Sequence, residues 1–204
     1  MLQVENLTVY YQTLKGQVHA LENASFTLAD GEIMGMAGES GCGKTTLGHS
    51  LIHLSPPMTD MQKMDAYRFN EISIIPQYAM NAMNPIRKIG PMTEDLLRAK
   101  KADVRTVMAA LKDRLEMVKL PQEVLNLYPI ELSGGMKQRM VMVLSTLLDP
   151  ELLIADEITS ALDVASQKAV AEMLVEFRNQ HCCNSVLFIT HDISILYQIA
   201  DSIL

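Results

Sequence analysis

The stretch Gly38-Glu-Ser-Gly-Cys-Gly-Lys-Thr-Thr46 decides the fold that this chain is expected to adopt. It fits the pattern G-x-x-x-x-G-K-[ST], in which glycines let backbone amides wrap phosphate oxygens. The lysine can reach the β- and γ-phosphates, and the threonine hydroxyl can ligate Mg²⁺. An apolar run, Glu32–Ala37, precedes the stretch as a predicted buried strand, and Thr45–His53 follows as a predicted helix. The candidate phosphate-binding residues are therefore Gly38, Glu39, Ser40, Gly41, Cys42, Gly43, Lys44, Thr45 and Thr46.

Upstream of this loop, the sequence predicts an antiparallel β layer. Apolar residues alternate over Leu2–Tyr11, with a change of phase near Asn6 that indicates an irregular strand. Val18–Leu28 reads as a second extended segment, and Ala29–Glu32 carries the turn residues of a hairpin leading into the next strand.

Downstream, predicted strands alternate with helices. The strands are Glu71–Ile75, Leu152–Ala155 and Ser185–Thr190, and Ser55–Asn70 is a connection rich in Pro and Met. Predicted helices occupy Met92–Lys100, Asp103–Val118, Gly134–Leu148 with Ser133 as N-cap, a long segment capped by Asp163, and a short segment before Leu204. Such alternation is typical of an α/β fold with a mainly parallel sheet, and the strand-free middle predicts an inserted helical subdomain.

Composition narrows the class of protein. The chain of 204 residues carries a net charge of −7 without a basic run, which argues against nucleic acid as a partner. Its three cysteines, Cys42, Cys182 and Cys183, are expected to be reduced thiols inside a cell. A metal site formed by His181 with the cysteine pair is a less favoured alternative. The N-terminus shows neither a basic nor an apolar signal-peptide region, so none is expected.

Four further patterns carry polar groups at positions where a ligand could bind. Asp156 and Glu157 end a predicted strand, and the carboxyl ends of parallel strands face ligands. Ser133–Gly135 opens a helix and offers amides to an anion. His191 and Gln77 each follow a strand. Taken singly, each pattern has an ordinary alternative: solvated acids, a capped helix, a surface histidine and an uninformative glutamine.

The order of these patterns along the chain resembles the ATPase subunit of an ATP-binding cassette (ABC) protein, a P-loop NTPase of RecA-like fold. The resemblance covers Leu2–Leu204. It implies one domain, with a core of residues 1–76 and 141–204 and a helical subdomain of about 77–140. It also implies an ATP hydrolase that binds ATP and Mg²⁺.

The same resemblance assigns roles to individual residues. Lys44 and His191 would contact the phosphates, and Glu157 would be the catalytic carboxylate. Gln77 would sense the γ-phosphate as a catalytic lid residue. The implied magnesium ligands are Thr45, Gln77 and Asp156. Tyr11 would stack on adenine, with neighbouring Tyr10 as the alternative. The remaining implied contacts are those of Ser133, Gly134 and Gly135 with the nucleotide of a facing subunit, and of Asp163 with the dimer partner.

Within the family, Gln77–Pro85 is similar to the lid run of peptide and nickel importers, although Ala79 and Met83 replace its usual Pro and Leu. This implies an importer subunit for oligopeptides, dipeptides or nickel, peripheral on the cytoplasmic face of the membrane. It would pair with a second ATPase subunit, non-identical or a second copy of itself. It would sit beneath two integral membrane permease subunits that receive cargo from an extracytoplasmic substrate-binding protein. The lid run, with Met83, is expected to be exposed. The alternative is an ABC ATPase that works without a membrane partner.

Overall fold

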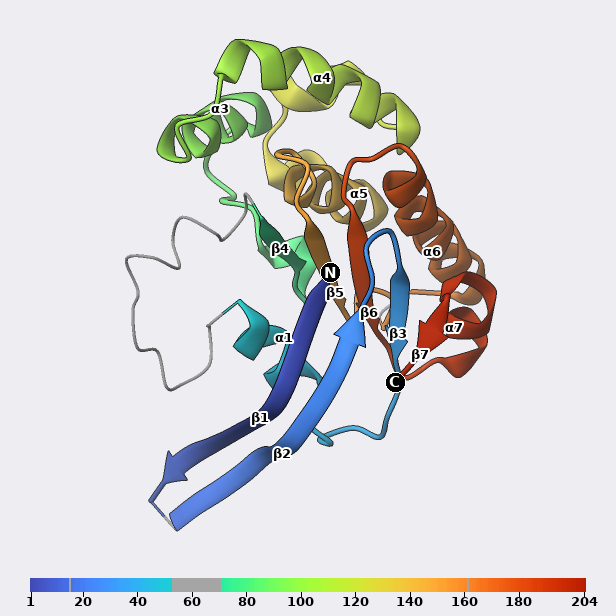
Figure 1. Cartoon of the computed structure of the whole chain (residues 1–204). Coiled ribbons are helices and arrows are strands. Elements are labelled where there is room, and N and C mark those ends of the chain that lie inside the picture. Colours follow the sequence, from blue (N-terminus) through green and yellow to red (C-terminus); the bar gives the residue numbers. More distant parts are fainter. Residues whose placement is uncertain (15, 53–70, 161) are drawn as a thin grey trace.

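The computed structural model describes residues 1–14, 16–52, 71–160 and 162–204. The predicted connection Ser55–Asn70 lies outside the described residues. The centre of the fold is a five-stranded parallel sheet in the order β4-β5-β6-β3-β7 (Figure 1). Its strands are β3 (Ile33–Met36), β4 (Ile72–Ile75), β5 (Leu152–Asp156), β6 (Ser185–Ile189) and β7 (Ser202–Ile203). The predicted mainly parallel α/β fold is therefore confirmed.

The strands are in register, so that their carboxyl ends form one edge of the sheet. Ile189 at the end of β6 lies opposite Met36 of β3 and Asp156 of β5, and Ile75 of β4 lies opposite Ala155. The segments that leave β3, β4, β5 and β6 therefore start at a common edge, which is where ligands bind in such sheets.

The sheet is buried on both faces, which explains its apolar strands. Alternate residues contribute to two clusters of buried side chains. On one face, Ile33, Leu153 and Phe188 pack in the larger cluster with residues of the helical elements; on the other, Met34 and Ile154 pack with helix α1 and the first two strands.

The first two strands form the predicted antiparallel layer. β1 (Leu2–Thr13) pairs with β2 (Gly16–Leu28), and Figure 1 shows this ribbon reaching away from the parallel sheet. The irregularity predicted near Asn6 is confirmed: the register shifts between Val4 and Leu7, and Asn6 adopts a φ of 51°.

The prediction of a hairpin at Ala29–Glu32 is wrong. The chain does turn there, with the Glu32 N–H donating to the Ala29 carbonyl at 3.3 Å, but β2 and β3 belong to different sheets. Turn residues fix the reversal of the chain and not the pairing of the strands. All four residues of β3 are buried, and β3 pairs with β6 and β7 instead. β7 itself was not predicted.

Helices fill the rest of the described chain. The α-helices are α1 (Lys44–Leu51), α3 (Ile89–Ala99), α4 (Val104–Met117), α5 (Gly134–Ser145), α6 (Val164–Asn179) and α7 (Ile193–Ile199). The 3₁₀ helices are η1 (Ala79–Asn81), η2 (Gln122–Asn126) and η3 (Pro129–Glu131). The predicted caps are confirmed, since Ser133 Oγ accepts from the Met136 N–H and Asp163 Oδ1 from the Ser166 N–H. Between β4 and β5 the described elements are all helical, as predicted.

Two helix boundaries differ from the prediction. α3 begins at Ile89 rather than Met92, because Pro91 lies in the first turn, where its missing N–H breaks no intrahelical bond. α5 ends at Ser145 rather than Leu148. The Thr146 N–H is shared between the carbonyls of Met142 at 3.2 Å and Val143 at 3.3 Å, which tightens the end of the helix, and the chain then turns.

Candidate functional site

The loop between β3 and α1 has the glycine-dependent backbone that the motif predicts. Gly43 caps α1 with a φ of 104°, a left-handed conformation that glycine adopts readily. A Cβ atom at this position would lie 2.5 Å from the Ala20 carbonyl oxygen of β2. Any other residue at position 43 would therefore force the loop away from the β ribbon.

Lys44 lies folded into this loop. Its side chain is buried, with the residue 6% exposed, and Nζ donates to the carbonyl oxygens of Gly38 at 2.7 Å and Glu39 at 2.8 Å. Within the described ranges, no carboxylate lies within ion-pair distance of this ammonium group. A buried cation that is bonded to neutral carbonyls can bind an incoming anion without first breaking a salt bridge.

A cavity of about 230 Å³ opens beside the loop and brings together residues from three strand ends. Gln77, which follows β4, and Glu157, which follows β5, line it together with the loop. Gln77 Nε2 donates to Glu157 Oε2 at 2.7 Å. The remaining lining residues are Ala20, Ser40, Gly41, Gly43, Lys44, Thr45 and Thr46.

Asp156 lies behind this cavity at the end of β5. The residue is 1% exposed, Oδ1 accepts a hydrogen bond from Thr45 Oγ1 at 3.2 Å, and Oδ2 has no hydrogen-bond partner among the residues that the structure describes. His49 of α1 holds its Nε2 4.0 Å from Oδ2. Burial raises the pKa of the Asp156 carboxyl, and the Thr45 bond and the His49 ring act in the opposite direction. An orphaned, buried carboxylate oxygen costs folding free energy, which indicates a site kept for a ligand.

Asp156→Asn is therefore expected to stabilise the nucleotide-free protein. A carboxyl whose folded pKa is raised binds its proton more tightly in the folded state, so its ionised form destabilises the fold above that pKa. The penalty falls as pH drops through the folded pKa and is absent below the unfolded value of 3.8. Thermal unfolding should show a higher midpoint for Asp156→Asn at neutral pH, with the advantage shrinking toward acid. A lower midpoint at neutral pH would contradict this reading.

Tyr11 and Tyr10 take different positions on β1. The Tyr11 hydroxyl donates to Thr46 Oγ1 at 3.5 Å, whereas Tyr10 faces His19 across the ribbon with ring centroids 6.1 Å apart. Only the first of the two alternatives is thus beside the loop. His191 follows β6 at the same sheet edge; its side chain is exposed and does not line the cavity.

Ser133–Gly135 lies apart from this cavity. The three residues are exposed at the start of α5, and Gly135 lines a separate cavity of about 380 Å³ together with Asp163 of the α6 cap. The cavities of about 230 and 380 Å³ share no lining residue. The structure therefore brings together the loop, Gln77 and the carboxylates, but not the helix-start motif.

His49 and Ala20 are neighbours of the site that sequence reasoning missed. His49 lies four residues after Thr45 on α1 and hence on the same helix face, a spacing that could have identified it. Ala20 borders the loop through its backbone, for which the sequence offers no signal.

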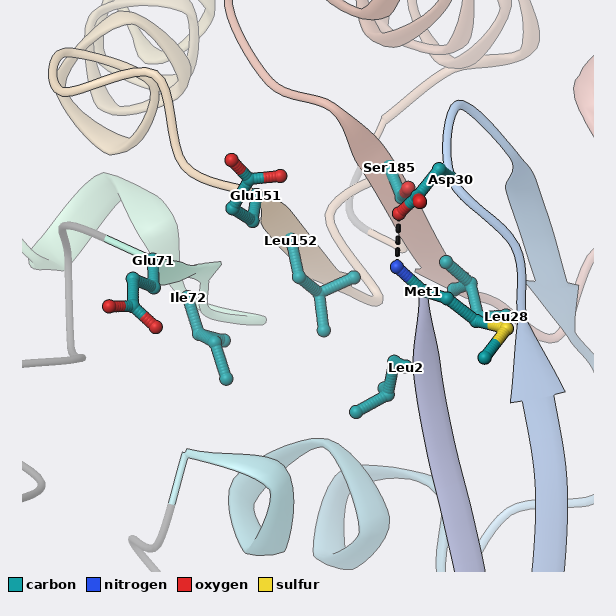
Figure 2. A pocket seen from close by; sticks show the side chains of 9 residues that line it. All are labelled: Met1, Leu2, Leu28, Asp30, Glu71, Ile72, Glu151, Leu152 and Ser185. Atoms are coloured by element: carbon teal, nitrogen blue, oxygen red, sulfur yellow. Dashed lines mark hydrogen bonds and ion pairs between the residues drawn. The ribbon is translucent and has the colours of Figure 1, made fainter.

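Figure 2 shows a further cavity, of about 150 Å³, at the opposite edge of the sheet. Glu71 and Glu151, which precede β4 and β5, lie on its rim, and the N-terminal ammonium group forms an ion pair with Asp30. It contains none of the predicted site residues. The thiols of Cys182 and Cys183 are buried and free; burial raises the pKa of Cys183 to about 12, so this thiol is unreactive. In the part of the chain that the structure describes, no cluster suits a metal ion held by His, Cys, Asp or Glu alone.

Comparison with known proteins decides the family. The family model described as "ABC transporter" matches residues 21–160. The chain belongs to the ABC transporter family. It is 36% identical to the dipeptide transport ATP-binding protein DppD of Bacillus subtilis, over all of this chain and 67% of the relative. It is 34% identical to the probable D,D-dipeptide transport ATP-binding protein DdpD of Escherichia coli, over all of this chain and 68% of that relative.

Solved structures agree on the ABC fold. The dimeric structure of MJ0796, a bacterial ABC transporter cassette, superposes with a TM-score of 0.83 at 23% identity and covers all of this chain and 93% of that one. CbiO1 from Clostridium perfringens gives a TM-score of 0.79 at 21% identity, and the match covers 98% of this chain and 81% of that one. This ABC chain is an ATP-binding, ATP-hydrolysing subunit of a transporter. Within the described ranges, no helix is long and apolar enough to cross a membrane.

Proposed function

We propose that this ABC subunit powers the import of short peptides. The observation that carries the ATPase part is the cavity in which Lys44, Gln77 and Glu157 meet. The substrate class rests on relatives named as dipeptide and oligopeptide transport proteins, which match this chain along its full length. The lid run also implies nickel as a cargo, and the transport test below distinguishes uptake of nickel from uptake of a peptide.

The cavity supports a specific division of roles for ATP. Backbone amides of Gly38–Thr46 and the Lys44 ammonium bind the β- and γ-phosphates. Glu157 orients and deprotonates the attacking water. His191, at the same sheet edge, contacts the γ-phosphate, and Tyr11 stacks on the adenine. Gln77 would leave its bond with Glu157 when the γ-phosphate arrives, which makes the carboxylate available to water.

The residues around Asp156 fit a magnesium ion. Mg²⁺ prefers oxygen ligands, and Thr45 Oγ1, the Gln77 side-chain amide oxygen and Asp156 supply them. The orphaned Oδ2 of Asp156 is the observation that supports this assignment. When bound, the ion neutralises charge that develops on the phosphates.

We further propose one ABC ATPase domain whose core comprises residues 1–76 and 141–204, with a helical subdomain at about 77–140. The division is supported by the element order, because β4 and β5 flank a described segment of helices alone. Arg114 of α4 bonds the Thr146 carbonyl and the Asp149 carboxylate and ties the subdomain to the core.

A facing ATPase subunit completes the site in this proposal. Ser133–Gly135 is exposed and lines no part of its own chain's ATP cavity, so its amides would bind the nucleotide of the partner, and Asp163 would contact that partner. MJ0796 is described as dimeric. We propose a non-identical ATPase as the partner; a second copy of this chain is the other arrangement.

Two permease subunits would dock beside the lid run on the cytoplasmic face of the membrane, with a substrate-binding protein delivering cargo outside. Tyr78 and Ile86 are 72% and 80% exposed and offer apolar contact there. The expectation that Met83 is exposed is wrong: it is 6% exposed and lines an apolar cavity of about 280 Å³ with Met92 and Leu96 of α3. Its side chain packs inward because Met92 and Leu96 of α3 lie beside it.

Gly135→Ala tests the helix-start motif. An added Cβ meets no atom of the described residues within 4 Å, and alanine favours helix by about 0.5–1 kcal/mol over glycine. We expect an unchanged or higher unfolding midpoint but at least about a tenfold loss of ATP hydrolysis, because the methyl group obstructs a nucleotide that approaches the backbone. Lys112→Ala, on the exposed face of α4, is the control. Full activity of Gly135→Ala would show that Ser133–Gly135 does not contact the nucleotide.

The transport proposal is tested by purifying the chain with its associated subunits. Membrane permeases should co-purify, and vesicles that contain the complex should take up a labelled dipeptide, but not nickel, when ATP is supplied. ATP hydrolysis by a chain that associates with no membrane subunit would favour the ABC ATPase that works without one.

A further inference from the structure

Glu157 has a strained backbone conformation that contacts with other parts of the protein must stabilise. Its φ is +47°, in the left-handed region that a residue with a Cβ rarely occupies and that costs of order 1–3 kcal/mol. On its N-terminal side, the Glu157 N–H donates to the Ile189 carbonyl at 2.9 Å. On the other side, the loop that joins Glu157 to α6 includes Ile158 and Thr159, which are 4% and 1% exposed.

Two glutamine side chains hold this loop from two different helices. Gln138 of α5 donates from Nε2 to the Ile158 carbonyl. Gln167 of α6 donates from Nε2 to the carbonyls of Thr159 at 3.1 Å and Leu162 at 3.2 Å. Gln138 thus bonds the Ile158–Thr159 peptide group, one residue after Glu157, and it is itself 4% exposed.

Gln138 lies beneath the exposed start of its helix. It follows Gly134 by four residues and Gly135 by three, which places the three positions on one helix face. Gly135 and Gln138 line the same cavity of about 380 Å³, where the space beside Gly135 is open. A ligand group that binds at Gly134 and Gly135 therefore lies on the same face of α5 as Gln138.

We infer that Gln138 is a positioning residue that links the start of α5 to the backbone of Glu157. This rests on the proposed shared site, in which a partner's nucleotide seats on Ser133–Gly135. Seating it fixes α5, and the Gln138 amide then holds the Ile158 peptide so that Glu157 points at the water of its own cavity. Nucleotide bound at one ATP site thereby promotes hydrolysis at the opposite site.

The test compares Gln138→Met with Gln167→Met. Methionine keeps the length of glutamine and suits a helix but donates no hydrogen bond. Each variant is assembled with a facing ATPase subunit whose own catalytic carboxylate is replaced, so that only this chain's site turns over. ATP affinity of the isolated chain and the hydrolysis rate at saturating ATP, with and without the facing subunit, are measured.

We expect the facing subunit to stimulate the wild type and Gln167→Met alike, within about threefold. Gln138→Met should lose the stimulation by about tenfold or more while its ATP affinity stays unchanged and its unfolding midpoint falls no further than that of Gln167→Met, since each variant loses hydrogen bonds to the same loop. A merely structural role predicts an equal loss in both glutamine variants, and that result would overturn the inference. Stimulation of Gln138→Met to the wild-type rate would overturn it as well. A wild type without stimulation by a facing subunit would overturn the proposed shared site and this inference together.

A second measurement needs no Gln138 variant. Hydrogen exchange at the Ser160 and Leu162 amides, which bond carbonyls within the loop, should slow when the facing subunit binds with ATP. The same exchange should stay fast in Ser133→Arg, which blocks seating. Equal exchange in the two proteins would contradict the link.

Discussion

Replacing Glu157 by glutamine is expected to slow ATP hydrolysis by roughly 10²–10⁴, the usual range for loss of a general base. The carboxylate lines the cavity beside Lys44 and reaches Gln77 at 2.7 Å, so it borders the space that the γ-phosphate and its water would occupy. Glutamine preserves the volume and removes the charge. ATP binding should persist, because the loop and Asp156 are untouched.

Single-turnover hydrolysis and equilibrium ATP binding check this expectation. Glu71→Gln is the matched control, since it removes an exposed carboxylate at the opposite edge of the sheet and should leave both measurements unchanged. Hydrolysis by Glu157→Gln at the wild-type rate would show that another group is the base.

Lys44→Ala should weaken ATP binding by about 10- to 100-fold and abolish turnover. A hydrogen bond to a charged group contributes about 1.5–3 kcal/mol, and 1.4 kcal/mol is about tenfold in affinity. The fold should survive, because within the described part of the chain the ammonium bonds only to carbonyls of its own loop and to the nearby Cys42 sulfur.

Calorimetric titration with Mg-ATP measures this loss. Lys168→Ala, which removes a solvent-exposed ammonium paired with Glu172 on α6, is the control and should bind ATP normally. Unchanged affinity in Lys44→Ala would contradict the role given to this lysine.

The parts of the fold that the sequence predicts best are those with one strong local cause. Apolar runs that end in polar residues predict parallel strands, and the shared register then brings Gln77, Asp156 and the loop to one edge. Helix caps at Ser133 and Asp163 follow from side-chain chemistry alone. The fold class and the meeting of Gln77 and Glu157 at the loop could thus be predicted.

Other features depend on tertiary structure that no local pattern encodes. The register shift between Val9 and Tyr10 decides which tyrosine reaches the loop, and alternation of residues cannot locate that shift. The burial of Met83 depends on α3 folding over it. β7 has two residues, too few for a periodic signal, and exists because the edge of β3 is available to pair. The left-handed Glu157 needs bonds from distant segments, which include Gln138 of α5.

The central claim is that ATP is bound between the loop of this chain and Ser133–Gly135 of a facing subunit. Size-exclusion chromatography of Glu157→Gln with Mg-ATP tests it most directly, because blocked hydrolysis should trap the closed state that ATP favours. We predict a shift to the dimer, alone or with the associated ATPase subunit, and none when Ser133→Arg is added to the same chain and to its facing copy. A Glu157→Gln protein that binds ATP yet stays monomeric with either partner would contradict the shared site.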